Sequence, residues 1–373
     1  MLRALARVNL AAIERNCGRL ASAAAPAALC AVVKANGYGH GAVPAARAAR
    51  VGGATWLAVA TAGEAADLRE GGLDGPLLVL GALSDEELEV ALLARADVAC
   101  WREAAAAGIA ERAGALGVTP GVHVKLDTGM GRLGTRDAGE ATRTVEAVAA
   151  DPRLRLAGAF THFATADHTE DPSFLREQLA RFTAWADGVR EAHPDVLVHA
   201  ANSAATLAEP AARLDMVRCG IGIYGLDPFG RDPAEQGLEP ALELRSYLAE
   251  VKPCAAGESA GYGRRFVAAR DTWLGTIPIG YGDGYRRALT NNAEVLVGGR
   301  RVPVVGAVSM DNITVDLGPG ETAPAERGAP VSLIGDGLRA EELAERIGTI
   351  NYEITCGITA RVPRAHHRDG APA

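Results

Sequence analysis

The sequence predicts an α/β fold in which an amino-terminal (β/α)₈ barrel, or TIM barrel, is followed by a second, mainly β domain. Helical and strand-like hydrophobic periods alternate eight times between about residues 12 and 230. The strand-like segments there are short apolar runs, as expected for a parallel sheet covered on both faces. After Pro228 the pattern changes to strand alternation with frequent glycines.

The barrel elements are expected in strict alternation along the chain. We predict helices at residues 12–24, 42–51, 62–70, 85–94, 103–116, 138–149, 172–192 and 203–208. We predict strands at residues 28–33, 56–60, 77–80, 97–100, 121–126, 155–160, 196–200 and 216–224. Doubly wound sheets rarely reach eight uninterrupted repeats, so a closed barrel is favoured over an open sheet.

The second domain is expected to consist mainly of strands. These are predicted at residues 242–252, 272–279, 294–297, 302–305, 313–317 and 331–334, with one helix at 339–347. We divide the chain into a barrel over 11–232 and a β domain over 233–373, to which a strand from 1–10 is added. The tail at 366–373 is expected to fray and to expose His366 and His367.

Composition restricts the class of protein. The chain has 373 residues, of which 48% are hydrophobic and 23% are charged, as in ordinary globular enzymes. Its net charge of -8 argues against a nucleic-acid partner. Six cysteines without C-x-x-C spacing indicate buried hydrophobic residues in a reducing compartment, so we expect a cytoplasmic protein. No apolar run reaches membrane-spanning length, and residues 20–33 are interpreted as a helix end plus a strand.

Lys34 is the most informative residue of the first predicted strand. Only three of the 38 basic residues are lysines, so a lysine where an apolar run ends calls for an explanation. An ε-amine can lose its proton and form a Schiff base, whereas a guanidinium cannot. Lys34 also begins a loop with three glycines, VKANGYGHG at residues 33–41. The alternative is a lysine that caps the strand and extends its stem along apolar surface.

The eighth predicted strand leads into a candidate phosphate site. Residues 215–225 read DMVRCGIGIYG, which matches the dinucleotide pattern G-x-G-x-x-G, but no helix is predicted to follow. We therefore reject that pattern and expect the backbone of Gly220 and Ile221 to bind phosphate at the last βα loops of the barrel. Asn202 and Ser203 would add donors at a helix start, although a plain N-cap is the alternative.

Three further residues are ambiguous when taken alone. Arg218 is a charge among apolar residues, and if buried it needs acceptors. His162, in FTHFA at 160–164, has no companion ligands at metal-binding spacing and is most simply a core histidine. Tyr262, in AGYGR at 260–264, has the surroundings of a turn residue.

The loop at residues 33–41 closely resembles the pyridoxal-phosphate (PLP) attachment segment of bacterial alanine racemases. The resemblance continues in VKLDTGMGRLG at 124–134, in IGYGDGYRR at 279–287 and in SMD at 309–311, and so covers almost the whole chain. It implies that Lys34 binds PLP and that Tyr262 of a partner subunit is a second acid/base. A phenol has a pKa near ~10, so neighbouring cations would have to lower it.

The resemblance also implies roles for other residues. Arg218 would face the pyridine nitrogen of PLP, with His162 between it and the catalytic tyrosine. Arg132 would bind the cofactor's phenolic oxygen and the substrate carboxylate, oriented by Lys125, which is carbamylated in some relatives. Tyr38 and Tyr352 would bind phosphate, and the backbone N–H of Met310 would bind the carboxylate. A substrate-access corridor would be formed by Asp167, Tyr281, Arg287 and Ile350.

The expected activity is a two-base interconversion of L-alanine and D-alanine by a homodimer with shared sites, supplying D-alanine for peptidoglycan. A guanidinium at Arg218 would not protonate the pyridine nitrogen, which favours return of the proton to Cα over transamination. Ala307 stands where many relatives carry an arginine in the corridor, so a broader racemase acting on serine, lysine or other amino acids remains an alternative. Two further alternatives are a PLP decarboxylase and a non-catalytic PLP-binding protein.

Overall fold

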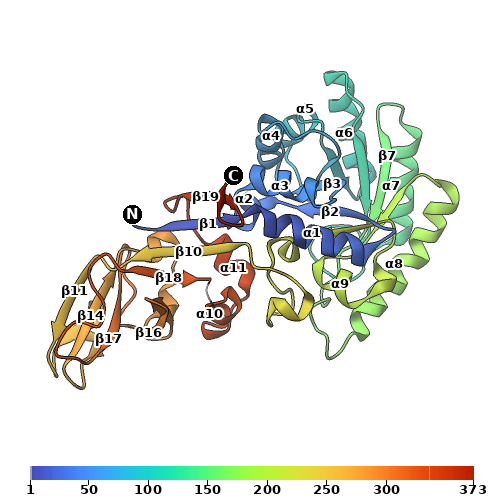
Figure 1. The fold of residues 1–373 in the computed structure, drawn as a ribbon. Coiled ribbons are helices and arrows are strands. Elements are labelled where there is room, and N and C mark those ends of the chain that lie inside the picture. Colours follow the sequence, from blue (N-terminus) through green and yellow to red (C-terminus); the bar gives the residue numbers. More distant parts are fainter. Residues whose placement is uncertain (1, 336) are drawn as a thin grey trace.

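The computed structural model describes residues 2–335 and 337–373 and has two lobes (Figure 1). One lobe is a closed barrel of eight parallel strands in the order β2 to β9. Its strands are β2 (Ala28–Val32), β3 (Trp56–Val59), β4 (Leu77–Val79), β5 (Asp97–Cys100), β6 (Gly121–Lys125), β7 (Arg155–Phe160), β8 (Leu197–His199) and β9 (Met216–Cys219). The predicted fold class, a barrel followed by a mainly β domain, is confirmed.

Helices surround the barrel strands and bury their apolar faces against them. They are α1 (Leu10–Ala24), α3 (Ala42–Val51), α4 (Ala62–Glu70), α5 (Asp85–Leu93), α6 (Glu103–Leu116), α7 (Ala138–Ala150), α8 (Ser173–Ala192) and α9 (Ser203–Ala208). Local sequence determines where several of them begin. Thr61 and Ser84 form capping boxes with Glu64 and Glu87, and Asn202 accepts from the N–H of Ala205 to cap α9.

The second lobe is built on a ten-stranded sheet in the order β11-β14-β17-β16-β15-β18-β10-β1-β19-β20. Its strands are β1 (Leu5–Asn9), β10 (Leu242–Tyr247), β11 (Glu250–Cys254), β14 (Thr272–Ile277), β15 (Glu294–Val297), β16 (Arg300–Val305), β17 (Ile313–Gly318), β18 (Pro330–Ile334), β19 (Arg364–Arg368) and β20 (Ala371–Pro372). A small hairpin of β12 (Ser259–Ala260) and β13 (Phe266–Val267) and the helices α10 (Ala340–Arg346) and α11 (Asn351–Cys356) complete the lobe.

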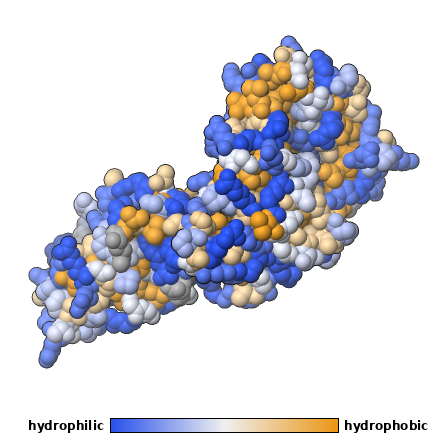
Figure 2. Space-filling model, turned by 45° about the horizontal axis from the view of Figure 1, so that its top comes forward, coloured by the Kyte–Doolittle hydropathy of each residue, from blue (hydrophilic) through white to orange (hydrophobic). Residues whose placement is uncertain are grey.

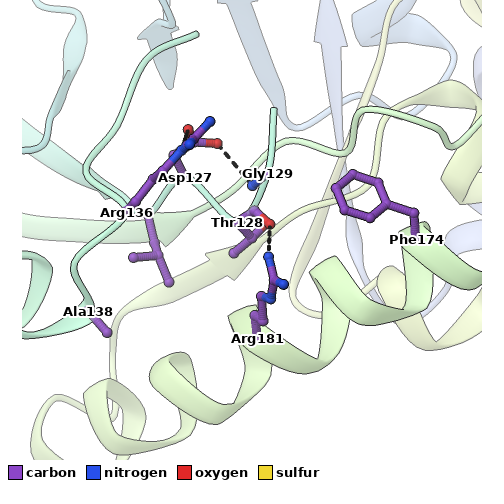
Figure 3. A pocket seen from close by; sticks show the side chains of 8 residues that line it. Asp127, Thr128, Gly129, Arg136, Ala138, Phe174 and Arg181 are labelled. Carbon is purple, nitrogen blue, oxygen red and sulfur yellow. Dashed lines mark hydrogen bonds and ion pairs between the residues drawn. The ribbon is translucent and has the colours of Figure 1, made fainter. Parts of the chain in front are cut away.

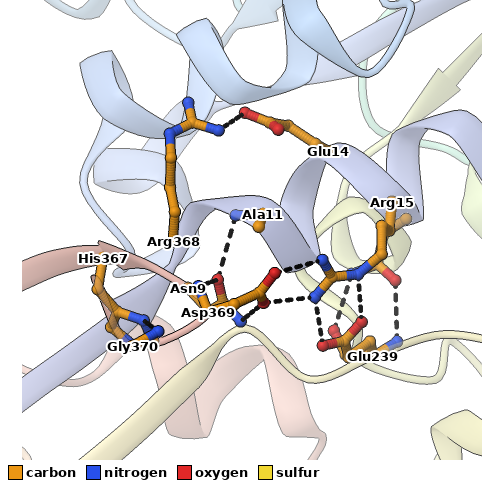
Figure 4. A network of polar contacts seen from close by, with 10 residues as sticks. Asn9, Ala11, Glu14, Arg15, Glu239, His367, Arg368, Asp369 and Gly370 are labelled. Atoms are coloured by element: carbon orange, nitrogen blue, oxygen red, sulfur yellow. Dashed lines mark hydrogen bonds and ion pairs between the residues drawn. The ribbon is translucent and has the colours of Figure 1, made fainter. Parts of the chain in front are cut away.

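The expectation of a frayed tail is wrong. β19 pairs in parallel with β1, and β20 folds back on β19. Asp369 forms an ion pair with Arg15 of α1, at 2.8 Å, and Arg15 also binds Glu239 at 2.7 Å (Figure 4). His366 and His367 are half-buried rather than exposed, and the Nε2 of His366 lies 2.9 Å from the carbonyl oxygen of His40. The tail therefore connects the sheet to the outside of the barrel.

Two predicted strands differ from the structure by more than two residues. The strand predicted at 216–224 ends at Cys219, because the backbone turns at Gly220 (φ -105°, ψ -91°) into the 3₁₀ turn η2 (Ile221–Tyr224). The strand predicted at 242–252 is two strands, β10 and β11, separated by Leu248 and Ala249. None of the helices described is long and apolar enough to cross a membrane.

Candidate active site

Lys34 lies where the first barrel strand ends. β2 stops at Val32, and Lys34 begins the short irregular helix α2 (Lys34–Tyr38), in which Ala35 and Asn36 both have φ of +52°. This left-handed backbone is strained for residues with a Cβ. It is held by Glu64, which accepts from the N–H of Ala35 at 2.6 Å. Burial, followed by the nearby charge of Arg132, lowers the pKa of the Lys34 amine.

A cavity of about 480 Å³ opens beside Lys34 at the carboxyl ends of the barrel strands. It brings together eleven of the residues that the sequence singled out, from several separate segments of the chain. These are Lys34, Tyr38, Lys125, Arg132, His162, Asn202, Ser203, Arg218, Gly220, Ile221 and Tyr352. The geometry places a primary amine, guanidinium groups, hydroxyls and backbone donors around one volume, which suits a small anionic ligand that carries a carbonyl.

One end of the cavity is formed by backbone donors and hydroxyls. The Ser203 hydroxyl accepts from the N–H of Gly220 at 3.0 Å and of Gly222 at 3.2 Å. A Cβ at position 220 would overlap the Tyr38 hydroxyl, so the tyrosine occupies space that only a glycine leaves open. The rings of Tyr38 and Tyr352 lie 6.0 Å apart. These hydroxyls and this backbone segment thus lie together at the end of the cavity for which the sequence predicts a phosphate site.

Arg218 is buried, and both of its terminal nitrogens have polar partners. Its guanidinium donates to the carbonyl oxygens of Thr161 at 2.8 Å and Ala200 at 3.0 Å. It also contacts two ring nitrogens, Nδ1 of His199 at 2.8 Å and Nδ1 of His162 at 3.2 Å. Burial lowers its pKa to about 10, so it stays charged at neutral pH. Because a guanidinium only donates, both imidazole nitrogens must accept, and the proton of neutral His162 is on Nε2.

His162 is neutral for an electrostatic reason. Burial, followed by the charge of Arg218, brings its pKa well below the usual value. Lys125 shares this environment: burial and then Arg218 lower its pKa to about 8, while its ammonium donates to the carbonyl oxygen of Leu133 at 2.7 Å. The centre of the Phe160 ring lies close to both cations, 5.7 Å from the Lys125 nitrogen and 5.4 Å from the Arg218 guanidinium carbon.

Six of the predicted site residues are not among those that line this cavity in the single chain described. They are Tyr262, Met310, Tyr281, Arg287, Ile350 and Asp167. Four of them are among the exposed large hydrophobic residues: the exposed fractions are 75% for Tyr262, 52% for Met310, 42% for Tyr281 and 59% for Ile350. Tyr262 lies in a turn between Gly261 and Gly263, both with positive φ. Ala307 is buried beneath this turn, next to Gly261.

The sequence also left some cavity residues unnoticed. Cys356 lines the cavity from α11 and is exposed, so the expectation that all six cysteines are buried is wrong for this one. The apolar residues Val32, Ala60, Leu80 and Phe160 line it as well. Their positions at strand ends were the only sign in the sequence that they line a cavity. A single apolar residue at a strand end cannot, however, be distinguished from a residue of the hydrophobic core.

A second cavity, of about 570 Å³, is lined by the loop after β6 and by Phe174 and Arg181 of α8 (Figure 3). Its guanidinium groups are already paired: Arg181 donates to the carbonyl oxygen of Thr128 at 3.2 Å and Arg136 contacts Asp127 at 3.3 Å. Asp127 in turn accepts from the N–H of Gly129 and Gly131 and so shapes the loop. The chemistry therefore concentrates in the cavity at Lys34.

Comparison with known proteins gives a consistent result for both lobes. A sequence profile of the N-terminal domain of alanine racemases matches residues 8–228, and one of the C-terminal domain matches residues 241–366. The alanine racemase of Symbiobacterium thermophilum is 42% identical over 368 residues, which cover 96% of each chain. The alanine racemase of Frankia casuarinae is 41% identical, covering 98% of this chain and 96% of the other. The solved alanine racemase of the D-cycloserine producer Streptomyces lavendulae is 37% identical with a TM-score of 0.92, covering 98% and 97%.

Proposed function

Because the chain belongs to the alanine racemase family, and is therefore an isomerase, we propose that it interconverts L-alanine and D-alanine with PLP and two bases. The observation that carries this proposal is the Lys34 amine, whose pKa is lowered at the end of β2 and which faces a cavity rimmed by phosphate-type donors. An amine that loses its proton readily can bond an aldehyde and can also exchange a proton with a carbon.

The residues present fit PLP. Lys34 would hold the aldehyde end, and Tyr38, Ser203, Gly220, Ile221 and Tyr352 would hold the phosphate, with Asn202 capping the adjacent helix. When bound, the cofactor supplies a ring that withdraws electrons from the amino-acid Cα. Arg218 would face the ring nitrogen without giving up its proton, which limits how far the ring accepts charge. Return of the proton to Cα is thereby favoured over transamination.

Racemisation needs a base on each face of Cα. We assign Lys34 to one face and Tyr262 of a partner subunit to the other, because Tyr262 projects from its own chain with three quarters of its surface exposed. Tyr262 removes the proton from the L enantiomer and Lys34 returns one from the opposite side, and the roles exchange in reverse. His162, whose proton is on Nε2, would donate to the oxygen of that tyrosine. A homodimer with shared sites follows.

The remaining predicted residues have roles in binding and access. Arg132 and the backbone N–H of Met310 would bind the substrate carboxylate, and Asp167, Tyr281, Arg287 and Ile350 would line the approach. Lys125, whose amine is partly neutral near pH 8, meets the chemical requirement for carbamylation and would then orient Arg132. The enzyme would act in the cytoplasm and supply D-alanine for peptidoglycan.

One experiment tests the proposal directly. The purified protein is examined for the visible absorbance of lysine-bound PLP and then incubated with L-alanine, with chiral analysis of the product. We expect the absorbance together with an equal mixture of enantiomers. Bound cofactor without D-alanine would contradict racemisation and support a carrier, and carbon dioxide release would indicate a decarboxylase. A panel of L-serine and L-lysine measures whether Ala307 has widened the substrate range.

A further inference from the structure

A continuous chain of polar side chains, buried except at the half-buried Asp97, runs through the barrel beneath the cavity. Arg218, near the carboxyl end of β9, contacts Nδ1 of His199 at 2.8 Å. Nε2 of His199 lies 2.9 Å from Nδ1 of His123, and Nε2 of His123 lies 3.3 Å from a carboxylate oxygen of Asp97. Asp97 is the first residue of β5, so the chain crosses from the cavity face toward the opposite face of the barrel.

The direction of every hydrogen bond in this chain follows from Arg218. A guanidinium has no acceptor, so Nδ1 of His199 must accept, and the proton of His199 is therefore on Nε2. That N–H donates to Nδ1 of His123, which places the proton of His123 on its own Nε2. The last N–H then donates to the Asp97 carboxylate. A second proton on either imidazole would make two N–H groups point at each other. Only one arrangement of protons therefore satisfies all the hydrogen bonds of this chain of side chains.

The barrel leaves room for this chain at two glycines. A Cβ at Gly158 of β7 would overlap Nδ1 of His123, and a Cβ at Gly121 of β6 would overlap the carboxylate of Asp97. Aromatic rings enclose the imidazoles. Phe160 stacks on His199 at 5.0 Å with an interplanar angle of 1°, and Trp56 meets His123 edge-on at 5.5 Å. Alanine at either glycine position would disrupt the chain, which indicates a built feature rather than chance proximity.

The charges at the two ends are consistent with neutral imidazoles between them. Burial alone would raise the pKa of Asp97, but the hydrogen bond from His123 and the nearby Arg155 hold it below its usual value. Burial, followed by the charge of Arg218, brings the pKa of His199 well below the ordinary range. Asp97 thus stays a carboxylate, and His199 stays neutral.

We propose that Asp97 is a positioning residue for Arg218: through His123 and His199 it keeps an acceptor nitrogen aimed at the guanidinium and so holds that group toward the cavity. The role in catalysis rests on the proposed function, in which Arg218 faces the cofactor ring. Asp97 itself touches neither substrate nor cofactor, since it lies at the amino end of β5. Removing its carboxylate frees His123 to move its proton to Nδ1, which would oppose the N–H of His199 and reverse the order at Arg218.

Nitrogen-15 NMR of histidine-labelled protein without cofactor tests the proton positions independently of activity. We expect His199 and His123 to be neutral, with the proton on Nε2. In Asp97→Ala we expect His123 and His199 to show a mixture of the two tautomers. In Asp97→Asn, which keeps an acceptor oxygen, we expect a tautomer mixture intermediate between those of the unmodified protein and Asp97→Ala. This variant also keeps the test possible if Asp97→Ala fails to fold. Arg155→Gln is the matched control, because it removes the outer partner of Asp97 and leaves the carboxylate in place.

The loaded enzyme supplies the second measurement. For Asp97→Ala we expect kcat to fall roughly 10-fold, as a small misplacement of a cofactor contact does, with the KM for L-alanine nearly unchanged. A proton found on Nδ1 of His199 in the unmodified protein would overturn the proposal, and so would tautomers and kcat that do not change in Asp97→Ala. If the unmodified protein failed to racemise alanine while the tautomers behaved as expected, the proposed function would fail and the hydrogen-bonded chain would stand.

Discussion

Lys34 and Lys125 line the same cavity, whereas the third lysine, Lys252, is exposed on β11. In a chain that otherwise uses arginine as its cation, two of the three lysines therefore lie at a cavity where an amine can do chemistry that a guanidinium cannot. The scarcity of lysine was therefore an informative signal for single residues. It pointed to the amine at Lys34 from the sequence alone, because the requirement is chemical and does not depend on long-range packing.

Replacing Lys34 with arginine keeps the charge but removes an amine that can lose its proton. We expect Lys34→Arg to lack the visible absorbance of covalently held cofactor and to lose activity by about 10³-fold or more. Absorbance spectra and a chiral assay for D-alanine measure the two effects. Lys252→Arg makes the same chemical change at an exposed position and should behave as the unmodified protein does. Racemisation at full rate by Lys34→Arg would exclude the assigned role.

The lowered pKa of Lys125 predicts that the free energy of unfolding depends on pH. Its pKa is about 8 in the folded chain and near ~10.4 when unfolded, so between these values the unfolded state holds a proton that the folded state has released. Its contribution to the free energy of unfolding therefore rises with pH across this interval. The difference between the unmodified chain and Lys125→Met should increase by roughly 1–2 kcal/mol from about pH 7 to about pH 9.5.

Urea unfolding of both proteins without cofactor measures this difference. Buffers free of carbon dioxide serve as the control, because a carbamylated amine would no longer titrate as a lysine. A difference that stays flat or falls with rising pH would show that the Lys125 pKa is not lowered.

Residues that affect the site only through other residues could not be predicted from the sequence. His123 and His199 lie on strands of ordinary apolar character, and the contacts that link them to each other and to Arg218 depend on how β6, β8 and β9 are arranged in the barrel. Cys356 was missed for a related reason, since a cysteine on a six-residue helix gives no local sign that it faces a cavity. The chemistry of a single residue can be predicted from the sequence. A hydrogen-bonded network can be predicted only when the topology of the fold is known.

At the scale of elements, the sequence was most reliable where periodicity was strong. The barrel strands and long helices lie close to their predicted ranges, because short apolar runs and capping residues act locally. The failures are elements made by distant contacts. β19 has the sequence RAHHR, without hydrophobic alternation, and forms because it pairs with β1. α11 is too short to show a period, and η2 replaces a predicted strand end at Gly220.

Arg364 of β19 shows how a tail element supports the site. Its guanidinium donates to the carbonyl oxygens of Gly39, in the loop after Lys34, and of Ile358, Thr359 and Val362. Arg364→Ala leaves these acceptors unpaired, so we expect the free energy of unfolding to fall by about 2–4 kcal/mol and PLP to bind more weakly.

Denaturant unfolding and cofactor titration measure these two quantities. Arg368→Ala is the matched control on the same strand, because Arg368 is exposed and pairs only with Glu14 among the described residues, so its loss should cost less than about 1 kcal/mol. Equal effects of the two substitutions would indicate that the contact with the Lys34 loop is unimportant.

At the scale of the whole molecule, hydrophobic residues reach the surface in patches on both lobes (Figure 2). Tyr262, Tyr281, Met310 and Ile350 are among the exposed large hydrophobic residues, and all four belong to the second lobe. A partner chain seated over these residues would remove their apolar surface from water. The cavity at Lys34 contains an amine and anion-binding groups, but Tyr262, the second base of the proposed mechanism, is not among the residues that line it in the single chain. A second copy of the chain that inserts its Tyr262 into the cavity would do two things. It would cover the exposed hydrophobic residues, and it would supply the second base to the cavity.

Mixing two inactive variants tests this assembly. Lys34→Ala and Tyr262→Phe each remove one base, and each homodimer should be inactive. When equal amounts are dissociated and reassociated together, a symmetric dimer with shared sites gives mixed dimers in which one of two sites has both Lys34 and Tyr262. We expect about one quarter of the unmodified activity to return, since about half of the random dimers are mixed. Size-exclusion chromatography verifies reassociation. If both bases belonged to one chain, every site in the mixture would lack one of them, and no activity would appear.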